Sequence, residues 1–468
     1  MKKIFIILAM LLCATALRAQ ETEREEIDAR WFKAHYQKSE QMIPMRDGTK
    51  LYTAIFTPKN KKSLHPILLN RTQNGCEPYS KKSATFWQEA IFAEYLYAEY
   101  IIVFQDVRGF GHSAGDSSTE KGASDAYDTA EWLLRKAKKN NGNIGVWGIA
   151  EDANWALQAA ACGHRAIKAV SAQAPVGESV GATKVLAPTL FVGGAFDDKS
   201  EAQLWNGYNS TLAANPSVDC RLVVGPWTHA AWRKNRQAEQ ECDDDSVFYH
   251  AEVEFPFFDH YLRGAESSGA SAAGALIYFT GENCWRELER WGDEQHEERL
   301  YFGENGALCE LQQQPSSSSS SYTVNPENPV SSDVMQTTEN REDILMFTSP
   351  ILERDMSVAG AIDVELNVKA SQPVADFVVR IIDVADNAES EMQVRSVIAT
   401  KCQITQEDVT KITLKTPDVA HTFMAGHRIK VLLHSTWGNK LKSTLNSKCD
   451  ITLLHDKSHP SHVSFQLQ

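Results

Sequence analysis

Short apolar runs alternate with helix-like stretches from residue 42 to about residue 264, and this alternation constrains the fold more than any other feature of the chain. Three of the runs are residues 66–69 (PILL), 100–104 (YIIVF) and 143–147 (NIGVW). Strands that alternate with helices form a parallel sheet that is covered on both faces. The pattern therefore predicts an α/β fold for this half, with residues 125–138 as a crossover helix.

After about Ser267 the pattern changes to β-branched runs with a period of two, as in residues 362–368 (IDVELNV) and 377–382 (FVVRII). Such alternation is typical of strands with one buried face, so an all-β domain is predicted. The serine run at residues 316–321 is expected to form a flexible surface loop. We predict a leader at residues 1–19, an α/β domain at 20–266 and a β domain at 267–468.

The leader begins with Lys2 and Lys3, continues with an apolar run to about residue 16 and ends in Leu17-Arg18-Ala19. This is the pattern of a secretory signal peptide, and the run is too short to span a bilayer as a helix. We expect export, to a periplasm or outside the cell. Cys13 fits a lipoprotein acceptor poorly, because the residues before it are not small, and it is interpreted as part of the apolar run.

Charge and cysteine content narrow the possible partners. The chain of 468 residues has a net charge of −14 and becomes more acidic once the leader with its basic residues is removed. An acidic surface repels nucleic acids and anionic membranes, so neither is expected as a partner. The nine cysteines include no CxxC pair, and any disulfide pairing stays open.

A strand, a sharp turn and a helix follow one another at residues 145–161. The strand runs into residues 148–154 (GIAEDAN), and an alanine-rich helix follows. This is the arrangement in which an α/β-hydrolase places its nucleophile. Downstream, two further apolar runs end in Asp197 and in His229, in the order nucleophile, acid, histidine that this fold uses.

At these residues the chain resembles the X-Pro dipeptidyl-peptidase and cocaine esterase type of serine α/β-hydrolases. The motifs that carry the resemblance are residues 46–48 (RDG), 71–72 (RT), 105–109 (QDVRG), 193–197 (GGAFD), 225–229 (GPWTH) and 258–264 (FDHYLRG). Residues 285–288 (WREL) and 376–380 (DFVVR) look like the C-terminal jelly-roll domain of that family. The resemblance implies an α/β-hydrolase domain followed by a β-sandwich of jelly-roll type, and serine hydrolysis of X-Pro peptide or ester bonds.

The resemblance also implies the roles of the site residues. Asp197 corresponds to the acid that orients the imidazole, and His229 to the general base. The family motif Gly-x-Ser-Tyr-x-Gly has its serine where this chain has Ala150. An oxyanion would be held by the backbone N–H of Glu151 and by Asn74, which stands where the family has a tyrosine. The short stretch between Ala150 and residue 193 indicates that the helical cap of the family is largely missing.

Three hypotheses remain open. We favour a pseudo-hydrolase that binds a peptide or acyl-ester small molecule, or a glycan, because the nucleophile, the tyrosine and the cap are missing together. The second is an active hydrolase with an unrecognised nucleophile, for which Glu151 and Asp152 are candidates that are better explained as acids of the first helical turn. The third is a binding module that uses the β domain. The sequence leaves the oligomeric state open.

Other candidate sites are weaker. The acidic run at residues 243–245 lacks the spaced ligands of a calcium loop, and six histidines (His112, His250, His260, His421, His427 and His434) have no metal-ligand spacing. We therefore predict neither a metal nor an organic cofactor. Arg108 is expected to tie loops to carboxylates near the sheet edge, with Asp106 as the expected partner.

Overall fold

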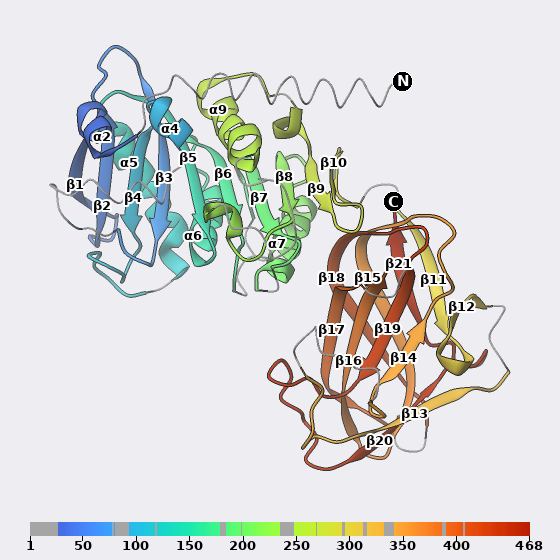
Figure 1. Cartoon of the computed structure of the whole chain (residues 1–468). Helices are drawn as coiled ribbons and strands as arrows, with labels where there is room; N and C mark the ends of the chain where they lie inside the picture. Colours follow the sequence, from blue (N-terminus) through green and yellow to red (C-terminus); the bar gives the residue numbers. More distant parts are fainter. Residues whose placement is uncertain are drawn as a thin grey trace, which may run out of the picture.

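The computed structural model describes residues 27–76, 79, 93–117, 119–177, 184–197, 199–234, 248–267, 269–292, 295–311, 316–331, 341–385, 390–405 and 408–468. Figure 1 shows two bodies, an α/β domain in blue to yellow-green and a β domain in yellow to red. The expected signal peptide, with Cys13, and the acidic run at 243–245 lie outside the described residues.

A ten-stranded sheet forms the centre of the first body, in the order β1-β2-β4-β3-β5-β6-β7-β8-β9-β10. The strands from β4 to β9 in this order run parallel, and β1, β2 and β10 pair antiparallel with their neighbours. The strands are β1 (Tyr36–Pro44), β2 (Lys50–Pro58), β3 (His65–Thr72), β4 (Ile101–Asp106), β5 (Asn140–Ile149), β6 (Ile167–Gln173), β7 (Thr189–Gly194), β8 (Cys220–Gly225), β9 (Ala275–Phe279) and β10 (Cys284–Leu288).

Helices cover both faces of this sheet, as the alternation in the sequence predicts. The helices are α2 (Ala29–His35), α4 (Ala93–Tyr97), η1 (Thr119–Lys121), α5 (Gly122–Lys136), α6 (Glu151–Ala161), α7 (Glu201–Ala214), η3 (Ala231–Lys234), η4 (Tyr249–Glu254), α9 (Phe255–Arg263) and η5 (Gly269–Ala272). In β3, Ile67 and Leu69 join the core with α5, α6 and α7, whereas Leu68 between them joins the core with α2, α4 and α9. The period of two within one strand thus fills two separate cores.

Two strands that follow the predicted domain boundary at residues 266/267 pair into the first sheet. Strand β9 pairs parallel with β8 and is buried along its whole length, and β10 pairs with β9, so both complete the first sheet. Residues 285–288, which the resemblance assigned to the C-terminal domain, therefore lie at the edge of the first sheet. The sequence alone does not separate these two short strands from the domain that follows, because both have the residue pattern of β-strands.

The second body contains two antiparallel sheets that share one core. Seven strands form one sheet and β14, β19, β16 and β17 form the other. The elements are β11 (His296–Phe302), η6 (Glu304–Gly306), β12 (Leu308–Cys309), β13 (Ser319–Val324), β14 (Leu345–Thr348), β15 (Met356–Ala370), β16 (Val374–Val384), β17 (Glu391–Gln403), β18 (Thr410–Phe423), β19 (Arg428–His434), β20 (Cys449–Leu454) and β21 (His462–Leu467). The more specific jelly-roll assignment stays a prediction.

One detail of the β domain differs from the sequence expectation. Ser319, Ser320 and Ser321 do not belong to a loop, because they form the start of β13 and pair with residues of β20. Two of their hydroxyls bond to side chains in or next to β20: Ser320 to His455, just after the strand, and Ser321 to Thr452 within it. A serine run is compatible with a strand when the paired strand supplies polar partners.

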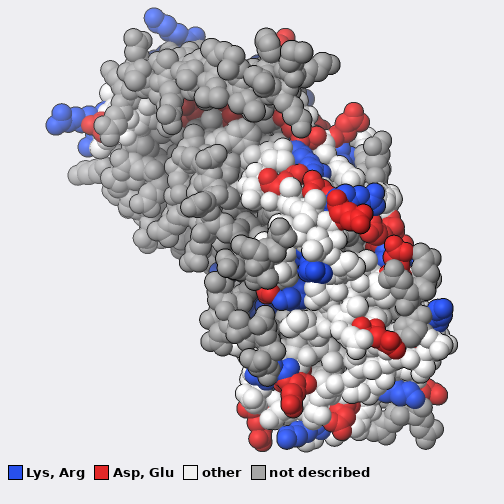
Figure 2. Space-filling view, turned by 45° about the vertical axis from the view of Figure 1, so that its right-hand side comes forward, with Lys and Arg blue, Asp and Glu red and all other residues white. Residues whose placement is uncertain are grey.

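The two bodies meet where β18 approaches the loop after β9. The Thr280 backbone N–H donates to the carbonyl of Ala420 (3.2 Å), and the Thr422 N–H donates to the carbonyl of Thr280 (2.8 Å). On the face shown in Figure 2, described Lys and Arg side chains lie interspersed with Asp and Glu side chains across the β domain. Within the described part of the chain, no helix is long and apolar enough to cross a membrane.

Candidate active site

The turn between β5 and α6 has the shape of a nucleophile elbow. Its central residue, Ala150, has φ 55° and ψ −122°, a conformation that costs a non-glycine residue on the order of 1–3 kcal/mol. Gly148 permits the sharp turn, since a Cβ at this position would lie 2.1 Å from the carbonyl oxygen of Asp152. The Ala150 N–H donates to the carbonyl of Gln173 (2.9 Å). The elbow is therefore formed, and a methyl group occupies its tip.

The acid and the histidine of the predicted triad lie in contact. The loop after β7 supplies Asp197 and the loop after β8 supplies His229, whose Nδ1 lies 2.9 Å from Asp197 Oδ2 and 3.1 Å from Oδ1. The Asp197 side chain is fully buried, whereas that of His229 is 24 % exposed. The carboxylate also accepts from the backbone N–H of Lys199 (3.1 Å) and from the hydroxyl of Ser200 (2.5 Å).

These three positions share one edge of the sheet. Strands β5, β7 and β8 run parallel within four adjacent strands (Figure 1). Ala150, Asp197 and His229 each follow the carboxyl end of one of these three strands. Open α/β sheets place their sites at this edge. A carboxylate that holds one ring nitrogen of a histidine fixes the tautomer, which leaves the other nitrogen available to a reacting group.

The predicted oxyanion donors lie beside the elbow. Glu151 opens helix α6, so its N–H belongs to the first turn, which has no intrahelical acceptor. Asn74 lies in the loop after β3, is exposed, and donates its backbone N–H to Thr72 Oγ1 (3.0 Å). This loop is tied to α6, because the N–H of Gln73 donates to Asp152 Oδ1 (3.2 Å). The direction of the Asn74 amide toward a ligand stays a prediction.

The two acids of the first turn of α6 have different surroundings. Asp152 is 6 % exposed and accepts the bond from Gln73, which binds the loop after β3 to the helix. Glu151 is exposed. Both lie where the helix dipole stabilises a negative charge, in agreement with their interpretation as first-turn acids.

A buried polar network beside the elbow was not found from the sequence. Gln173 ends β6 and accepts a bond from Trp232 Nε1 (2.9 Å), while its amide donates to Glu254 (2.5 Å). Glu254 also accepts from Ser171 (3.2 Å), and its second oxygen lies 2.9 Å from Nδ1 of His250. This network joins β6, the strand next to the one that leads into the elbow, to η3 and η4. Only a polar residue at the end of an apolar strand, Gln173, signals it in the sequence.

The expected pair of Arg108 and Asp106 is wrong. Arg108 donates two bonds to Asp125 (2.9 and 2.6 Å) and one to Asp47 (2.8 Å). Asp106 instead accepts from the backbone N–H groups of Cys76 (2.7 Å) and His112 (2.8 Å). Backbone N–H groups of the neighbouring loops therefore occupy the carboxylate of Asp106 at the end of β4. Arg108 binds two carboxylates that lie further away in the sequence.

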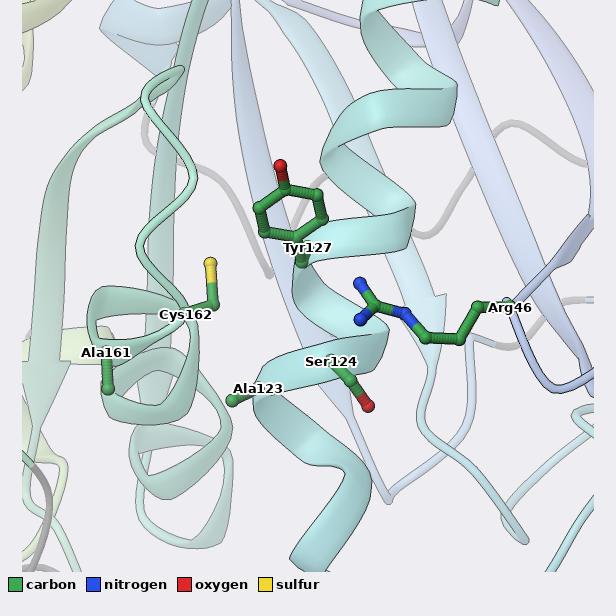
Figure 3. A pocket seen from close by; sticks show the side chains of 6 residues that line it. All are labelled: Arg46, Ala123, Ser124, Tyr127, Ala161 and Cys162. Carbon is green, nitrogen blue, oxygen red and sulfur yellow. The ribbon is translucent and has the colours of Figure 1, made fainter.

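A separate cavity of about 460 Å³ lies between α5 and the end of α6. Six residues line it: Arg46, Ala123, Ser124, Tyr127, Ala161 and Cys162 (Figure 3). Ala161 is the last residue of α6, so the cavity lies about 16 Å along the helix from the elbow. The guanidinium of Arg46 is bound to Asp128 (2.7 Å), and burial raises the pKa of the Cys162 thiol. The cavity therefore holds no group poised for the chemistry of the elbow.

The structure also bears on the prediction about metals and on the disulfide pairing that the sequence left open. Among the described residues no group of three or more His, Cys, Asp and Glu side chains is placed to hold a metal ion. The seven described cysteines are free: Cys76, Cys162, Cys220, Cys284, Cys309, Cys402 and Cys449.

Two known domain families match parts of this chain. Residues 47–181 match the X-Pro dipeptidyl-peptidase (S15 family) domain, and residues 264–464 match the X-Pro dipeptidyl-peptidase C-terminal non-catalytic domain. The chain is of the X-Pro dipeptidyl-peptidase and cocaine esterase type. Cocaine esterase from a Rhodococcus species is 21 % identical over 90 % of this chain and 97 % of its own length.

Solved structures show the same fold over nearly the whole chain. An aminopeptidase from a marine sediment archaeon of the Thaumarchaeota superimposes with a TM-score of 0.80 at 22 % identity, covering 95 % of this chain and 98 % of its own. An α-amino acid ester hydrolase has a TM-score of 0.79 at 21 % identity, with 96 % and 99 % covered. The two-domain arrangement is therefore that of known hydrolases.

Proposed function

We propose that this chain is a pseudo-hydrolase of the X-Pro dipeptidyl-peptidase and cocaine esterase type, which retains the acid and histidine and lacks the nucleophile. The observation that carries the proposal is Ala150, which occupies the tip of a formed elbow with φ 55°. A methyl group cannot attack a carbonyl, and loss of a triad nucleophile lowers turnover on the order of a million-fold. The chain would bind a peptide or acyl-ester small molecule at this edge without turning it over.

The surroundings of the elbow argue against a substitute nucleophile. Burial raises the pKa of the Cys76 thiol, with the Asp106 carboxylate adding to the effect, and this disfavours the reactive thiolate. Asp152 is committed to the N–H of Gln73. Glu151 is exposed, and Ile149 lies two positions before it, whereas an elbow nucleophile needs small residues two positions away on either side.

The test restores the missing hydroxyl. Residues 20–468 are purified as the native sequence, as Ala150→Ser and as Ala150→Ser/His229→Ala, with Ala161→Ser as a control that adds a hydroxyl at the far end of the same helix. Each is assayed on an X-Pro amide and a short-chain aryl ester and is treated with a fluorophosphonate. We expect labelling and turnover from Ala150→Ser alone, because its hydroxyl would lie at the elbow with Asp197 and His229 in contact.

Turnover by the native chain that disappears on His229→Ala would contradict the proposal and point to a hidden nucleophile. Silence from both the native chain and Ala150→Ser would locate the defect in the oxyanion donors or the missing cap instead. The connection from β6 to β7 spans only residues 174–188, which leaves little room for a cap.

Two further parts of the proposal concern location and ligand. The signal pattern of residues 1–19 supports export, which N-terminal sequencing of the secreted or periplasmic protein would test. Glycan binding, and ligand binding by the β domain alone, stay predictions without a specific observation to favour them.

A further inference from the structure

The loop that carries Asp197 is fastened to the loop that carries His229. The N–H of Ala195 donates to the carbonyl of Gly225 (2.8 Å), and the N–H of Phe196 donates to the carbonyl of Trp227 (3.0 Å). Gly194 allows this close approach, since a Cβ there would lie 2.0 Å from the Trp227 carbonyl oxygen. Any movement of the acid loop is therefore transmitted to His229.

A side chain of the β domain contacts this loop on both sides of Asp197. Arg395, on β17, donates from Nη1 to the carbonyl of Ala195 (3.2 Å), two residues before the acid. The same guanidinium forms an ion pair with Glu201, four residues after the acid, where α7 begins. The Glu201 N–H in turn donates to the Asp197 carbonyl (3.1 Å).

Arg395 is held in place by a further bond within the β domain, and its contacts are shielded from solvent. Arg395 Nη2 donates to the carbonyl of Asp418 on β18 (3.1 Å). The side chains of Arg395 and Glu201 are 14 % and 12 % exposed. A second contact reinforces the position, because Trp291 Nε1 donates to Asp418 Oδ2 (2.7 Å) and its ring packs against Trp205 of α7 at 4.9 Å.

We propose that Arg395 is a positioning residue, through which the β domain holds the Asp197 loop in the place that keeps His229 oriented. The planar guanidinium suits this role, because its fork reaches several acceptors in fixed directions, which a lysine ammonium on a flexible stem does not. Its removal would take the Arg395 cation away from the Glu201 carboxylate at the start of α7, close to Asp197. The β domain would then be a part of the site rather than an appendage. The expected effect of Arg395 on catalysis rests on the proposed function. Its effect on the orientation of His229 can be measured in the native chain.

The first measurement is made on the full native sequence from residue 20. Proton NMR of histidine-labelled protein detects the downfield Nδ1–H signal of a histidine bonded to a carboxylate, assigned through its loss in His229→Gln. The pair of His250 and Glu254 supplies an internal control signal from the same domain. We expect Arg395→Gln to broaden or abolish the His229 signal and to leave the His250 signal in place, and Arg395→Lys to restore it in part.

A matched control excludes a general loss of stability. Arg380→Gln removes another buried arginine, from the neighbouring strand β16, whose bond to Gln393 (2.6 Å) stays within the β domain. It should leave the His229 signal unchanged. Should Arg395→Gln fail to fold, Glu201→Gln removes the same ion pair from the other side, and the same loss of signal is expected.

The second measurement uses the Ala150→Ser background. There Arg395→Gln should lower kcat on the order of 10- to 100-fold, with KM within about twofold, because the reacting geometry is disturbed and the binding surface is not. A folded Arg395→Gln or Glu201→Gln protein with an intact His229 signal would overturn the proposal. An inactive Ala150→Ser protein would count against the proposed function only, since the NMR signal decides the role of Arg395 independently.

Discussion

Ala150 holds a backbone conformation that alanine adopts only when its surroundings impose it. The bond from its N–H to Gln173 and the close contact of Gly148 with Asp152 supply that constraint. The strain at the elbow therefore persists in a chain without the serine that such strain serves to present. The retained geometry is the reason to expect that a single hydroxyl restores chemistry.

One prediction at the residue scale concerns Gly148. The change Gly148→Ala places a methyl group against backbone at 2.1 Å, which cannot move aside as a flexible side chain would, so the free energy of unfolding should fall by about 2–3 kcal/mol. Gly142→Ala is the control, because its added methyl meets nothing within 4 Å and carries only the strain of a positive φ. Equal losses for the two variants in urea unfolding would show that the close contact does not constrain the elbow.

At the scale of elements, two arginines join the turn between β1 and β2 to helix α5. Arg108 binds Asp47 in the turn and Asp125 in the helix, with side chains of Arg108 and Asp125 that are 8 % and 2 % exposed. Arg46 makes a similar link to Asp128, and its side chain is 58 % exposed. The same pair of elements is thus joined by a buried bridge and a solvent-exposed one.

These two bridges allow a matched test. Arg108→Gln leaves the buried carboxylate of Asp125 without its cation, and the free energy of unfolding should fall by about 3 kcal/mol. Arg46→Gln should have a much smaller effect, because water and salt screen an exposed pair. Chemical denaturation of both variants at pH 7 measures the difference, and similar losses would refute the role assigned to burial.

On the scale of the whole molecule, the β domain carries several buried histidines. Burial lowers the pKa of His434 to about 4, and it also lowers the pKa values of His421 and His455. His421 lies at the contact between the two bodies, where its Nδ1 is 2.9 Å from the Thr280 hydroxyl. Protonation therefore bears on the β domain and on its junction with the α/β domain.

The sign of the resulting pH dependence follows from proton binding. Below pH 6.5 His434 binds a proton in the unfolded chain and stays neutral in the folded chain. The free energy of unfolding therefore decreases as the pH is lowered from about 6.5 to about 4. His434 alone accounts for a loss of up to about 3 kcal/mol over that range. Thermal unfolding between pH 4 and pH 7 should show a shallower pH slope for His434→Gln than for the native chain. An unchanged slope would exclude His434 as a contributor.

The sequence alone determined the parts of this protein that depend on local pattern. Alternating apolar and helical segments predicted the parallel sheet, and the period of two predicted β15, whose residues Ile362, Val364, Leu366 and Val368 enter the core. The order of Ala150, Asp197 and His229 along the chain predicted a common site at the carboxyl edge, because parallel strands end on the same side.

Only the tertiary structure decided which distant residues meet. In the folded chain Arg108 binds Asp125 rather than Asp106, and β9 and β10 pair into the first sheet. Arg395 contacts the loop that carries Asp197. These contacts join residues up to 200 positions apart, and side chains of the same kind occur at many other places in the sequence. Local pattern records burial and backbone shape, whereas the choice among several equivalent partners depends on how the elements pack.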